Sequence, residues 1–588
     1  MKWMAIVATV FTCLSVYALP AIGSGAGSAV QKTAGFDPGK FWSMDEIRKI
    51  PLDIEIVSSK IDNSYRLDEI YFTSEIHPDG PTRIFIAFAR PVDPKKPVPV
   101  YFDIHGGGGH ADPGRALWFA REMQCAAVSI DWSGEFIKGA DRYTIWRGPN
   151  PNPYMTSYNV TPDAKSSSLY RIVMAIRRAM DFLGTQKEVD ANQIACGGGS
   201  WGGFLSNLLA GVDERVKCTT CALGAGAFKE STKGTIAAGA NALPPTQRRL
   251  WIAAFDPASY ASRVTAPTMQ YACANDYFFW LGDVQDNYRM LHGNKRFLIR
   301  PNSNHECGGP QTPFALMKWV SACLMGDMAF PKIVPGSFRK SGRIYTWKCE
   351  GPVDTNKSTL YWSPGDVSWP SRYWLAIPAA KKGNVWQAQV PERFAGLSCQ
   401  VFATVFDMEN RAISTEVVHH AGQNPCAQRG PLWADDAIWD KQSGADAWRP
   451  TGSAVNTGPG DTRIETASNG VVTIGPGKGN TQFAALTNSI ILANGYANSN
   501  KGIRLTINGN GQFGSLTVTL QRNSGCTNEV AYTAQVKYGP ASTTINIPWS
   551  AFKAPKDAPV VLYPFDGFRI DGTRSDDSPI TIESLELL

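Results

Sequence analysis

One serine of this chain stands in a setting that can make it a nucleophile. The segment Gly198-Gly199-Ser200-Trp201-Gly202 is the only G-x-S-x-G, and it follows the strand-like run Gln193–Cys196 and precedes the helix-compatible run Gly203–Ala210. A sharp strand-to-helix turn pushes a serine hydroxyl clear of a sheet, and glycines allow the strained backbone. We therefore predict that Ser200 attacks a carbonyl carbon. A structural turn with an incidental serine is the alternative.

A run of glycines offers backbone amides for the negative charge that such an attack creates. His105-Gly106-Gly107-Gly108-Gly109 follows a buried strand-like run. Amides of Gly107 and Gly108, together with that of Trp201, are predicted to form an oxyanion hole. A flexible loop is the structural alternative. We expect the His105 side chain to order this loop rather than to act as a base.

A general base and an acid must come from later in the chain, because proteins with this serine turn place the acid and then the histidine after it. His305 follows the last strand-like run of the region, whereas His292 precedes that run and is the weaker choice. Asp276 stands where the preceding strand-like run ends and is the predicted acid. Asp283 and Asp286 are alternatives in the helical segment that follows.

Aromatic residues crowd the long segment after the strand that ends at Asp131. Among them, Trp132, Trp146 and Tyr154 are candidate substrate-binding residues. Aromatic rings above a sheet can stack on sugar rings or on a phenolic acyl group. They can equally form the core of their own loop. The sequence leaves both interpretations open.

The elements that position these residues alternate between strands and helices. Residues 30–333 contain short apolar runs separated by amphipathic stretches, of which Ser168–Leu183 has the clearest apolar face and is followed by Gly184. Phe314–Met325 is predicted to be a closing helix. This alternation predicts an α/β catalytic domain with a mostly parallel sheet covered by helices. The runs expected to form its buried strands are Val98–Ile104, Ala126–Asp131, Gln193–Cys196, Thr268–Cys273 and Arg296–Arg300.

Two all-β modules are predicted to follow. Residues 334–425 change to alternating patterns with turns, which favours a small β-sandwich. A linker is expected at 426–432, and residues 433–588 form a Gly/Asn/Thr-rich module with long alternating strands, typical of a jelly roll. Cys349 and Cys399 could form a disulfide bond that stabilises the sandwich.

The start of the chain predicts export. Residues 1–29 combine a charged start, an apolar run and a small-residue exit, as a secretory signal peptide does. The run is short for a membrane anchor, so we expect a secreted or periplasmic protein without a membrane partner after cleavage. The 588 residues are 43% hydrophobic and 18% charged with a net charge of +6, which indicates globular modules rather than disorder. No basic cluster indicates nucleic-acid binding.

Metal and cofactor signals are weak. The one CxxC, formed by Cys218 and Cys221, ends a buried apolar stretch and has no second ligand pair, so we expect two buried thiols and no metal in the catalytic domain. Asp566 and Asp571 could help to bind a structural calcium in the last module.

At the level of families, the motifs HGGGG, GGSWGG, ANDYFF (274–279) and PNSNH (301–305) resemble those of secreted α/β-hydrolase serine esterases. The most similar groups are dienelactone-hydrolase-like acetylxylan esterases and the PhoPQ-activated pathogenicity-related family. The resemblance covers about 300 residues and implies Ser200 as nucleophile, Asp276 as acid and His305 as base. The segment 565–588 resembles carbohydrate-binding jelly rolls attached to polysaccharide-active enzymes.

Three functions compete on this basis. The first is a serine carboxylesterase that removes acyl groups, acetyl above all, from a polysaccharide such as xylan. The second is a prolyl-oligopeptidase-like serine peptidase or a hydrolase of small esters. The third is a carbohydrate-binding surface protein without catalysis, which the complete Ser/Asp/His set disfavours. The oligomeric state does not follow from the sequence.

Overall fold

The computed structural model describes the chain from residue 36 onward with several gaps. The predicted signal peptide (1–29) and linker (426–432) lie outside the described residues. The gaps are 138, 150–151, 233, 302, 304, 306–310, 327–329, 352–354, 365–368, 370–371, 373, 410, 423–447, 451–461, 467–470, 488–501, 523–529 and 555–566.

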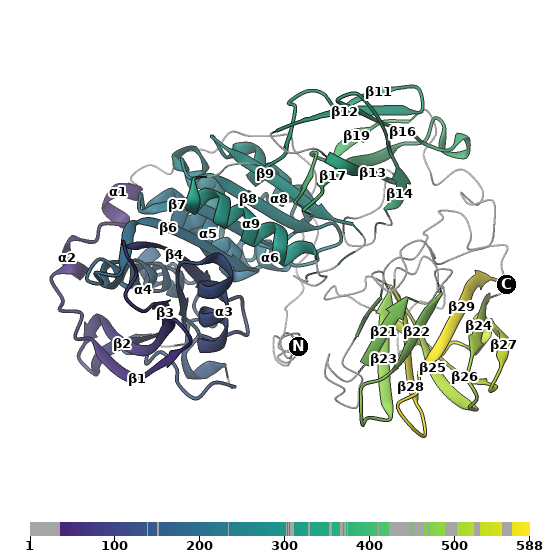
Figure 1. Cartoon of the computed structure of the whole chain (residues 1–588), viewed down its shortest axis with the longest axis horizontal. Helices are drawn as coiled ribbons and strands as arrows, with labels where there is room; N and C mark the ends of the chain where they lie inside the picture. Colours follow the sequence, from purple (N-terminus) through teal and green to yellow (C-terminus); the bar gives the residue numbers. More distant parts are fainter. Residues whose placement is uncertain are drawn as a thin grey trace.

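A nine-stranded sheet forms the centre of the first unit, in the order β1-β2-β3-β5-β4-β6-β7-β8-β9 (Figure 1). β1, β2, β3 and β5 pair antiparallel, and from β5 onward all pairs are parallel. The crossed order β5-β4-β6 brings the ends of β4 and β6 side by side. The strands are β1 (Glu55–Asp62), β2 (Tyr65–His77), β3 (Gly80–Pro91), β4 (Val98–Ile104), β5 (Ala126–Ile130), β6 (Val189–Gly199), β7 (Val216–Ala222), β8 (Thr268–Cys273) and β9 (Lys295–Arg300).

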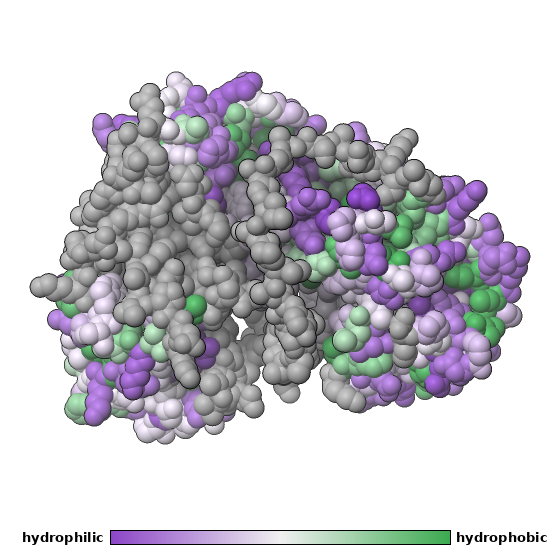
Figure 2. All heavy atoms as spheres, turned by 180° about the vertical axis from the view of Figure 1, so that it is seen from behind, coloured by the Kyte–Doolittle hydropathy of each residue, from purple (hydrophilic) through white to green (hydrophobic). Residues whose placement is uncertain are grey.

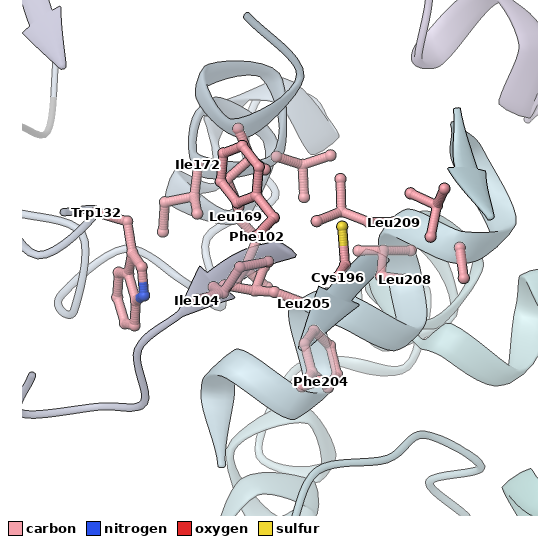
Figure 3. Packing of buried hydrophobic residues seen from close by; sticks show 14 of the residues in the cluster. Phe102, Ile104, Trp132, Leu169, Ile172, Cys196, Phe204, Leu205, Leu208 and Leu209 are labelled. Carbon is pink, nitrogen blue, oxygen red and sulfur yellow. The ribbon is translucent and has the colours of Figure 1, made fainter. Parts of the chain in front are cut away.

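Helices cover both faces of this sheet, because side chains alternate between its two sides. Tyr101 of β4 belongs to the core beneath α3 and α9, whereas the next residue, Phe102, belongs to the core beneath α4, α5 and α8. Figure 3 shows the second core, in which Phe102 and Ile104 lie near side chains of α4 and α5. The helices are α1 (Pro38–Phe41), α2 (Asp45–Arg48), α3 (Pro113–Met123), α4 (Ser168–Leu183), α5 (Trp201–Val212), α6 (Thr235–Asn241), α7 (Pro245–Phe255), α8 (Leu281–Met290) and α9 (Gln311–Met325).

The predicted helices and parallel strands agree well with this architecture. Helix α4 has the predicted bounds, and the Ser167 hydroxyl caps it by accepting from the Leu169 amide at 3.2 Å. The antiparallel strands β1–β3 and the strand β7 were not among the predicted elements. The fold is that of an α/β-hydrolase, extended at one edge by β1.

The second unit is a β-sandwich with two five-stranded sheets. One has the order β10-β12-β16-β15 with β11 on β12, and the other has the order β14-β13-β17-β18 with β19 on β17. The strands are β10 (Lys332–Ile333), β11 (Arg339–Ser341), β12 (Ile344–Glu350), β13 (Thr355–Pro364), β14 (Leu375–Pro378), β15 (Ala380–Lys382), β16 (Val385–Gln389), β17 (Cys399–Asp407), β18 (Ala412–Ser414) and β19 (Val418–His420).

The suggested disulfide of the sandwich is wrong in this structure. Cys349 and Cys399 are both free thiols. They lie on strands of different sheets, and the Cys399 sulfur is 3.7 Å from the Tyr345 hydroxyl instead. Cys218 and Cys221 are also free and buried, as two structural thiols would be.

The sandwich packs against the β9 edge of the hydrolase unit. The Ile299 amide of β9 donates to the Ser414 hydroxyl of β18 at 2.9 Å. On α8, Gln285 forms two hydrogen bonds with the backbone of Val417. Trp374 of the sandwich is fully buried in the core that also contains α4 and α5. These contacts make the sandwich a direct neighbour of the sheet edge where the acid and histidine are predicted.

The third unit also consists of two five-stranded sheets, ordered β20-β23-β28-β25-β26 and β21-β22-β29-β24-β27. The turn at Asn508–Gly511 carries the chain from β24 in one sheet to β25 in the other. It therefore connects the two sheets and is not the turn of a β-hairpin. The strands are β20 (Trp448–Pro450), β21 (Thr462–Thr466), β22 (Val472–Pro476), β23 (Gln482–Thr487), β24 (Gly502–Asn508), β25 (Gly514–Arg522), β26 (Val530–Tyr538), β27 (Ser542–Pro548), β28 (Gly567–Thr573) and β29 (Ile580–Leu587).

On the face shown in Figure 2, hydrophilic and hydrophobic side chains of the described residues are intermingled. Among the exposed apolar residues are Ile56 and Ile61 on β1 and Ile76 on β2. Within the described ranges, every helix is too short or too polar to cross a bilayer.

Candidate active site

Ser200 occupies a strained turn between β6 and α5. Its φ of 59° and ψ of −123° are a conformation that L-residues adopt rarely. The turn is held from both sides, because the Ser200 amide donates to Ala222 O at 2.8 Å and the Phe204 amide donates to Ser200 O at 2.9 Å. Backbone strain of this kind costs about 1–3 kcal/mol and persists where the surroundings determine it. The turn presents a serine at the amino end of a helix, where the dipole favours negative charge.

Close contact with β4 explains two of the glycines beside Ser200. A Cβ at Gly198 or at Gly202 would overlap the carbonyl oxygen of Ile104, the last residue of β4. Only glycine lets this turn at residues 198–202, the elbow that carries Ser200, approach the adjacent strand so closely. The approach brings the end of β4, and the glycine loop after it, next to Ser200.

The glycine loop lies over the elbow as predicted from its position. A Cβ at Gly106 would be 3.2 Å from the Ser200 Cβ, and one at Gly107 would be 3.0 Å from Cδ1 of Trp201. Gly107 and Trp201 are therefore neighbours. The Gly108 amide, also predicted to be an oxyanion donor, has another partner: it donates to the Tyr154 hydroxyl at 3.1 Å.

His105 orders this loop. Its Nδ1 lies 2.7 Å from Gly106 O, and its Nε2 accepts from the Trp132 amide at 3.2 Å. The imidazole is stacked on the Trp132 indole with ring centroids 4.8 Å apart. With both nitrogens engaged and 3% of the residue exposed, His105 is a structural group.

The predicted acid and base lie side by side at the ends of β8 and β9. His305 Nδ1 is 2.7 Å from Asp276 Oδ2. The other oxygen of Asp276 accepts the amides of Phe278 at 2.7 Å and Phe279 at 3.0 Å. Asp276 is buried, and the His305 side chain is 11% exposed. The bond at Nδ1 makes Nε2 the nitrogen of His305 that can exchange protons with a substrate or a serine.

Aromatic residues of the same turn surround the His305 ring. The Phe278 ring meets the imidazole edge-on at 4.5 Å, and the Phe279 ring is nearly parallel to it at 6.2 Å. The turn is fastened from the other side by α6, whose first amides at Thr235 and Ile236 donate to the carbonyls of Tyr277 and Phe278. Segments distant in sequence therefore restrict how the histidine can move.

Asn275 is a functional candidate that the sequence interpretation missed. It is buried next to Asp276, and its backbone amide donates to Ser303 O in the loop that carries His305. Its side-chain amide donates to the carbonyl of Arg372 in the sandwich. Asn275 thus joins the acid turn, the histidine loop and the second unit. Its place beside Asp276 was visible in the sequence, but its partners were not.

The alternative residues make their contacts elsewhere. His292 is exposed before β9. Asp283 accepts from the Thr232 hydroxyl at 2.8 Å, and Asp286 forms an ion pair with Lys229. Neither carboxylate is within bonding distance of a histidine in the described contacts.

Two of the three aromatic candidates are core residues of their own loop. Trp132 and Trp146 are 3% and 8% exposed, and each indole N–H donates to a backbone carbonyl, of His105 and of Trp132 respectively. Tyr154 is half-buried beside the glycine loop. The structure thus favours the loop-core interpretation for both tryptophans.

No group of three or more His, Cys, Asp or Glu side chains suited to a metal ion occurs in the described part of the chain. Of the two possible calcium ligands, Asp566 lies outside the described residues. Asp571 forms an ion pair with Arg569 at 2.5 Å.

The crossed parallel sheet, the strained serine turn and the contact between Asp276 and His305 define a class of protein. This class is the α/β-hydrolases with the site of a serine ester hydrolase.

Two family models match the chain in agreement with this class. Residues 29–224 match the model described as acetyl xylan esterase (AXE1), and this stretch contains the glycine loop and Ser200. Residues 244–335 match the model described as PhoPQ-activated pathogenicity-related protein, and this stretch contains Asp276 and His305. The resemblance inferred from the motifs is confirmed, and the catalytic unit is a serine ester hydrolase of the carbohydrate-esterase type.

Several solved structures are similar to about half of the chain. An acetyl xylan esterase from Paenibacillus sp. R4 is 24% identical, with a TM-score of 0.42, over 50% of this chain and 96% of that protein. Acetyl xylan esterase 1 from Thermoanaerobacterium sp. JW/SL YS485 is 18% identical, with a TM-score of 0.42, over 49% and 93%. A putative acetyl xylan esterase from Bacteroides fragilis NCTC 9343 is 15% identical, with a TM-score of 0.32, over 45% and 72%. No curated protein sequence matches the chain.

Proposed function

We propose that this protein is an exported serine carboxylesterase that removes acyl groups, acetyl above all, from a polysaccharide such as xylan. Ser200 is its nucleophile, His305 its general base and Asp276 its acid. The observation that carries the proposal is the 2.7 Å contact between His305 and Asp276, in a unit whose strained serine turn contains Ser200.

In this mechanism His305 Nε2 takes the proton of the Ser200 hydroxyl while the oxygen attacks the ester carbonyl carbon. The tetrahedral intermediate collapses, the C–O bond to the alcohol breaks, and His305 returns the proton to the leaving oxygen. Water, deprotonated by His305, then attacks the acyl carbon, the bond from that carbon to Ser200 Oγ breaks, and His305 returns the proton to Oγ as the acid leaves. Asp276 holds the imidazole through Nδ1 and stabilises its protonated form.

The oxyanion is held by backbone amides in this proposal. The Trp201 amide stands at the first position of α5, where amides have no partner within the helix. The Gly107 amide is the second donor, since Gly107 lies against Trp201. The Gly108 amide is already engaged by Tyr154 and is left out of the hole.

The polysaccharide and the acetyl group are supported by the acetyl xylan esterase model that matches residues 29–224. Export is supported by the signal-like residues 1–29. The β-sheet unit at 448–588 would bind carbohydrate and keep the catalytic unit near its polymer, which raises the local ester concentration. No cofactor takes part in the proposed chemistry, and calcium bound in the last unit would have a structural role only.

The test compares wild type with Ser200→Ala on p-nitrophenyl acetate, acetylated xylan and a peptide amide. We expect release of acetate from both esters, and a loss of about 10⁴-fold or more in kcat in the variant. Cleavage of the peptide alone would favour a peptidase. Cleavage of p-nitrophenyl acetate without xylan would restrict the protein to small esters, and no cleavage at all would favour a binding protein.

A further inference from the structure

The glycine loop has little internal support: among the described contacts, one backbone hydrogen bond within it, from the Gly109 amide to Gly106 O at 3.1 Å, closes a turn. Residues 106–109 are all glycine, and glycine loses more conformational freedom on ordering than any other residue. An oxyanion donor is effective only when it already points at the developing charge. Something outside the loop must therefore restrain it.

The segment after β5 supplies these restraints at both ends of the loop. At the first end, the Trp132 indole N–H donates to His105 O at 2.9 Å. At the other end, the Ser133 hydroxyl donates to Gly109 O at 2.7 Å. The Ser133 oxygen is also 2.9 Å from Oδ1 of the fully buried Asp131, so its one proton is shared between Gly109 O and this carboxylate. The other carboxylate oxygen of Asp131 accepts the backbone amides of Gly134 and Thr144. The support is thus a buried, hydrogen-bonded network.

Tyr154 holds the middle of the loop. Its hydroxyl accepts the amide of Gly108, which has a φ of +81° and no atom near its missing Cβ. Packing at the Cα cannot restrain such a residue, so this hydrogen bond fixes the Gly108 peptide within the turn that the Gly109 amide closes onto Gly106 O. The Tyr154 ring lies 5.3 Å from the Trp132 indole, and this ring contact positions the hydroxyl.

The bond at Gly108 determines the orientation of the neighbouring peptide. The Gly108 N–H and the Gly107 carbonyl belong to one planar unit, and that unit meets the Gly107 amide unit at a single Cα. Fixing the first plane limits the directions that the Gly107 N–H can take. Burial raises the pKa of Tyr154 above its usual range, so the hydroxyl stays neutral and keeps this role at any pH near neutrality.

We propose that Tyr154 is a positioning residue of the oxyanion hole: its hydroxyl fixes the Gly107–Gly108 peptide and thereby keeps the Gly107 N–H directed toward the developing charge. The proposal deepens the esterase function proposed above and rests on it. In this proposal Tyr154 acts through its hydrogen bond to the backbone of Gly108, and not by stacking on the substrate.

The test is Tyr154→Phe, which removes only the hydroxyl. Its matched control is Tyr143→Phe, because the Tyr143 hydroxyl also accepts backbone amides, those of Gly139 and Ala140 at 2.9 Å each, but in the described contacts it makes no hydrogen bond to residues 106–109. On p-nitrophenyl acetate we expect kcat of Tyr154→Phe to fall about 10- to 100-fold with KM within about 2-fold, since only the transition state uses the oxyanion donors. Tyr143→Phe should keep wild-type kcat.

A second readout separates positioning from folding. A fluorophosphonate reacts with the serine through a five-coordinate phosphorus centre whose phosphoryl oxygen gains negative charge, and fluoride leaves as the O–P bond forms. Its labelling rate should therefore fall together with kcat in Tyr154→Phe. Ser133→Ala, which removes the support at Gly109, should lower both quantities in the same direction. Melting temperatures report folding for every variant.

Equal kcat in Tyr154→Phe and wild type, an equal loss in Tyr143→Phe, or a change in KM alone would overturn the proposal. Failure of the esterase function has a different signature: the wild type would cleave none of the esters. The labelling rates would still rank the variants in that case.

Discussion

The Nδ1 atom of His305 and the Oδ2 atom of Asp276 lie 2.7 Å apart across 29 residues of chain. The carboxylate cannot swing away from this contact, because its other oxygen accepts the amides of Phe278 and Phe279. The orientation of the imidazole is thus set by two backbone amides through Asp276. Because of this relationship, the effect of a substitution at Asp276 on the imidazole can be predicted.

Asp276→Asn should inactivate the protein without unfolding it. The amide oxygen of Asn would keep accepting the Phe278 and Phe279 amides, which turns the NH₂ group toward His305 Nδ1. That contact favours the tautomer with hydrogen on Nε2, which cannot accept the serine proton. We expect kcat on p-nitrophenyl acetate to fall about 10³- to 10⁴-fold with an unchanged melting temperature. More than a tenth of wild-type activity would contradict the assigned role.

Asn275→Ala should affect both stability and turnover. It removes the side-chain bond to Arg372 O in the sandwich and loosens the turn before Asp276, at a cost of about 1–3 kcal/mol in the free energy of unfolding. Gln285→Ala is the control, because Gln285 also bonds to the sandwich, at Val417, but away from the acid. Urea unfolding and kcat are measured for both variants. We expect kcat to fall only in Asn275→Ala, and an equal fall in both would remove the special role of Asn275.

Asp283 should make stability depend on pH. Burial, together with the nearby charge of Asp286, raises the pKa of Asp283 to about 7, although the Thr232 hydroxyl lowers it. Between about pH 4 and 7 the native state holds a proton that the unfolded state has released, so the free energy of unfolding falls as pH rises through this window and stays low above it. The full change is up to about 4 kcal/mol.

Asp283→Asn should remove this dependence while keeping an oxygen that accepts from Thr232. The melting temperature of the variant relative to wild type should therefore rise between pH 5 and pH 8. An identical difference at the two pH values would show that Asp283 ionises normally in the folded protein.

Gly202→Ala should prevent folding of the elbow. The added Cβ would overlap the Ile104 carbonyl, and both atoms belong to backbone that cannot move without separating β4 from β6. We expect little soluble protein and no fluorophosphonate labelling. Gly39→Ala is the matched substitution, since its Cβ would meet only the Asp37 carboxylate at 3.3 Å, and it should remain soluble. Active, soluble Gly202→Ala would show that the elbow tolerates a wider separation.

Local sequence patterns were sufficient to predict many helices and strands of the catalytic unit. Helix α4 and strands β4 and β8 have the predicted bounds, because apolar periodicity, caps and flanking glycines act over a few residues. The antiparallel strands β1–β3 were missed. Most of the last ten residues of β3 are buried, and such a run lacks the alternation that marks a strand.

The sequence by itself determined the serine turn, the glycine loop and the candidates Asp276 and His305, because each depends on residue types at short spacing beside a strand end. Only the tertiary structure decided which side chains support them. Tyr154 binds Gly108, Asn275 reaches Arg372 in another unit, and Trp132 is buried against His105 rather than open to substrate. These contacts join residues far apart in the chain, and the paths of the intervening loops, which no local pattern encodes, bring them together.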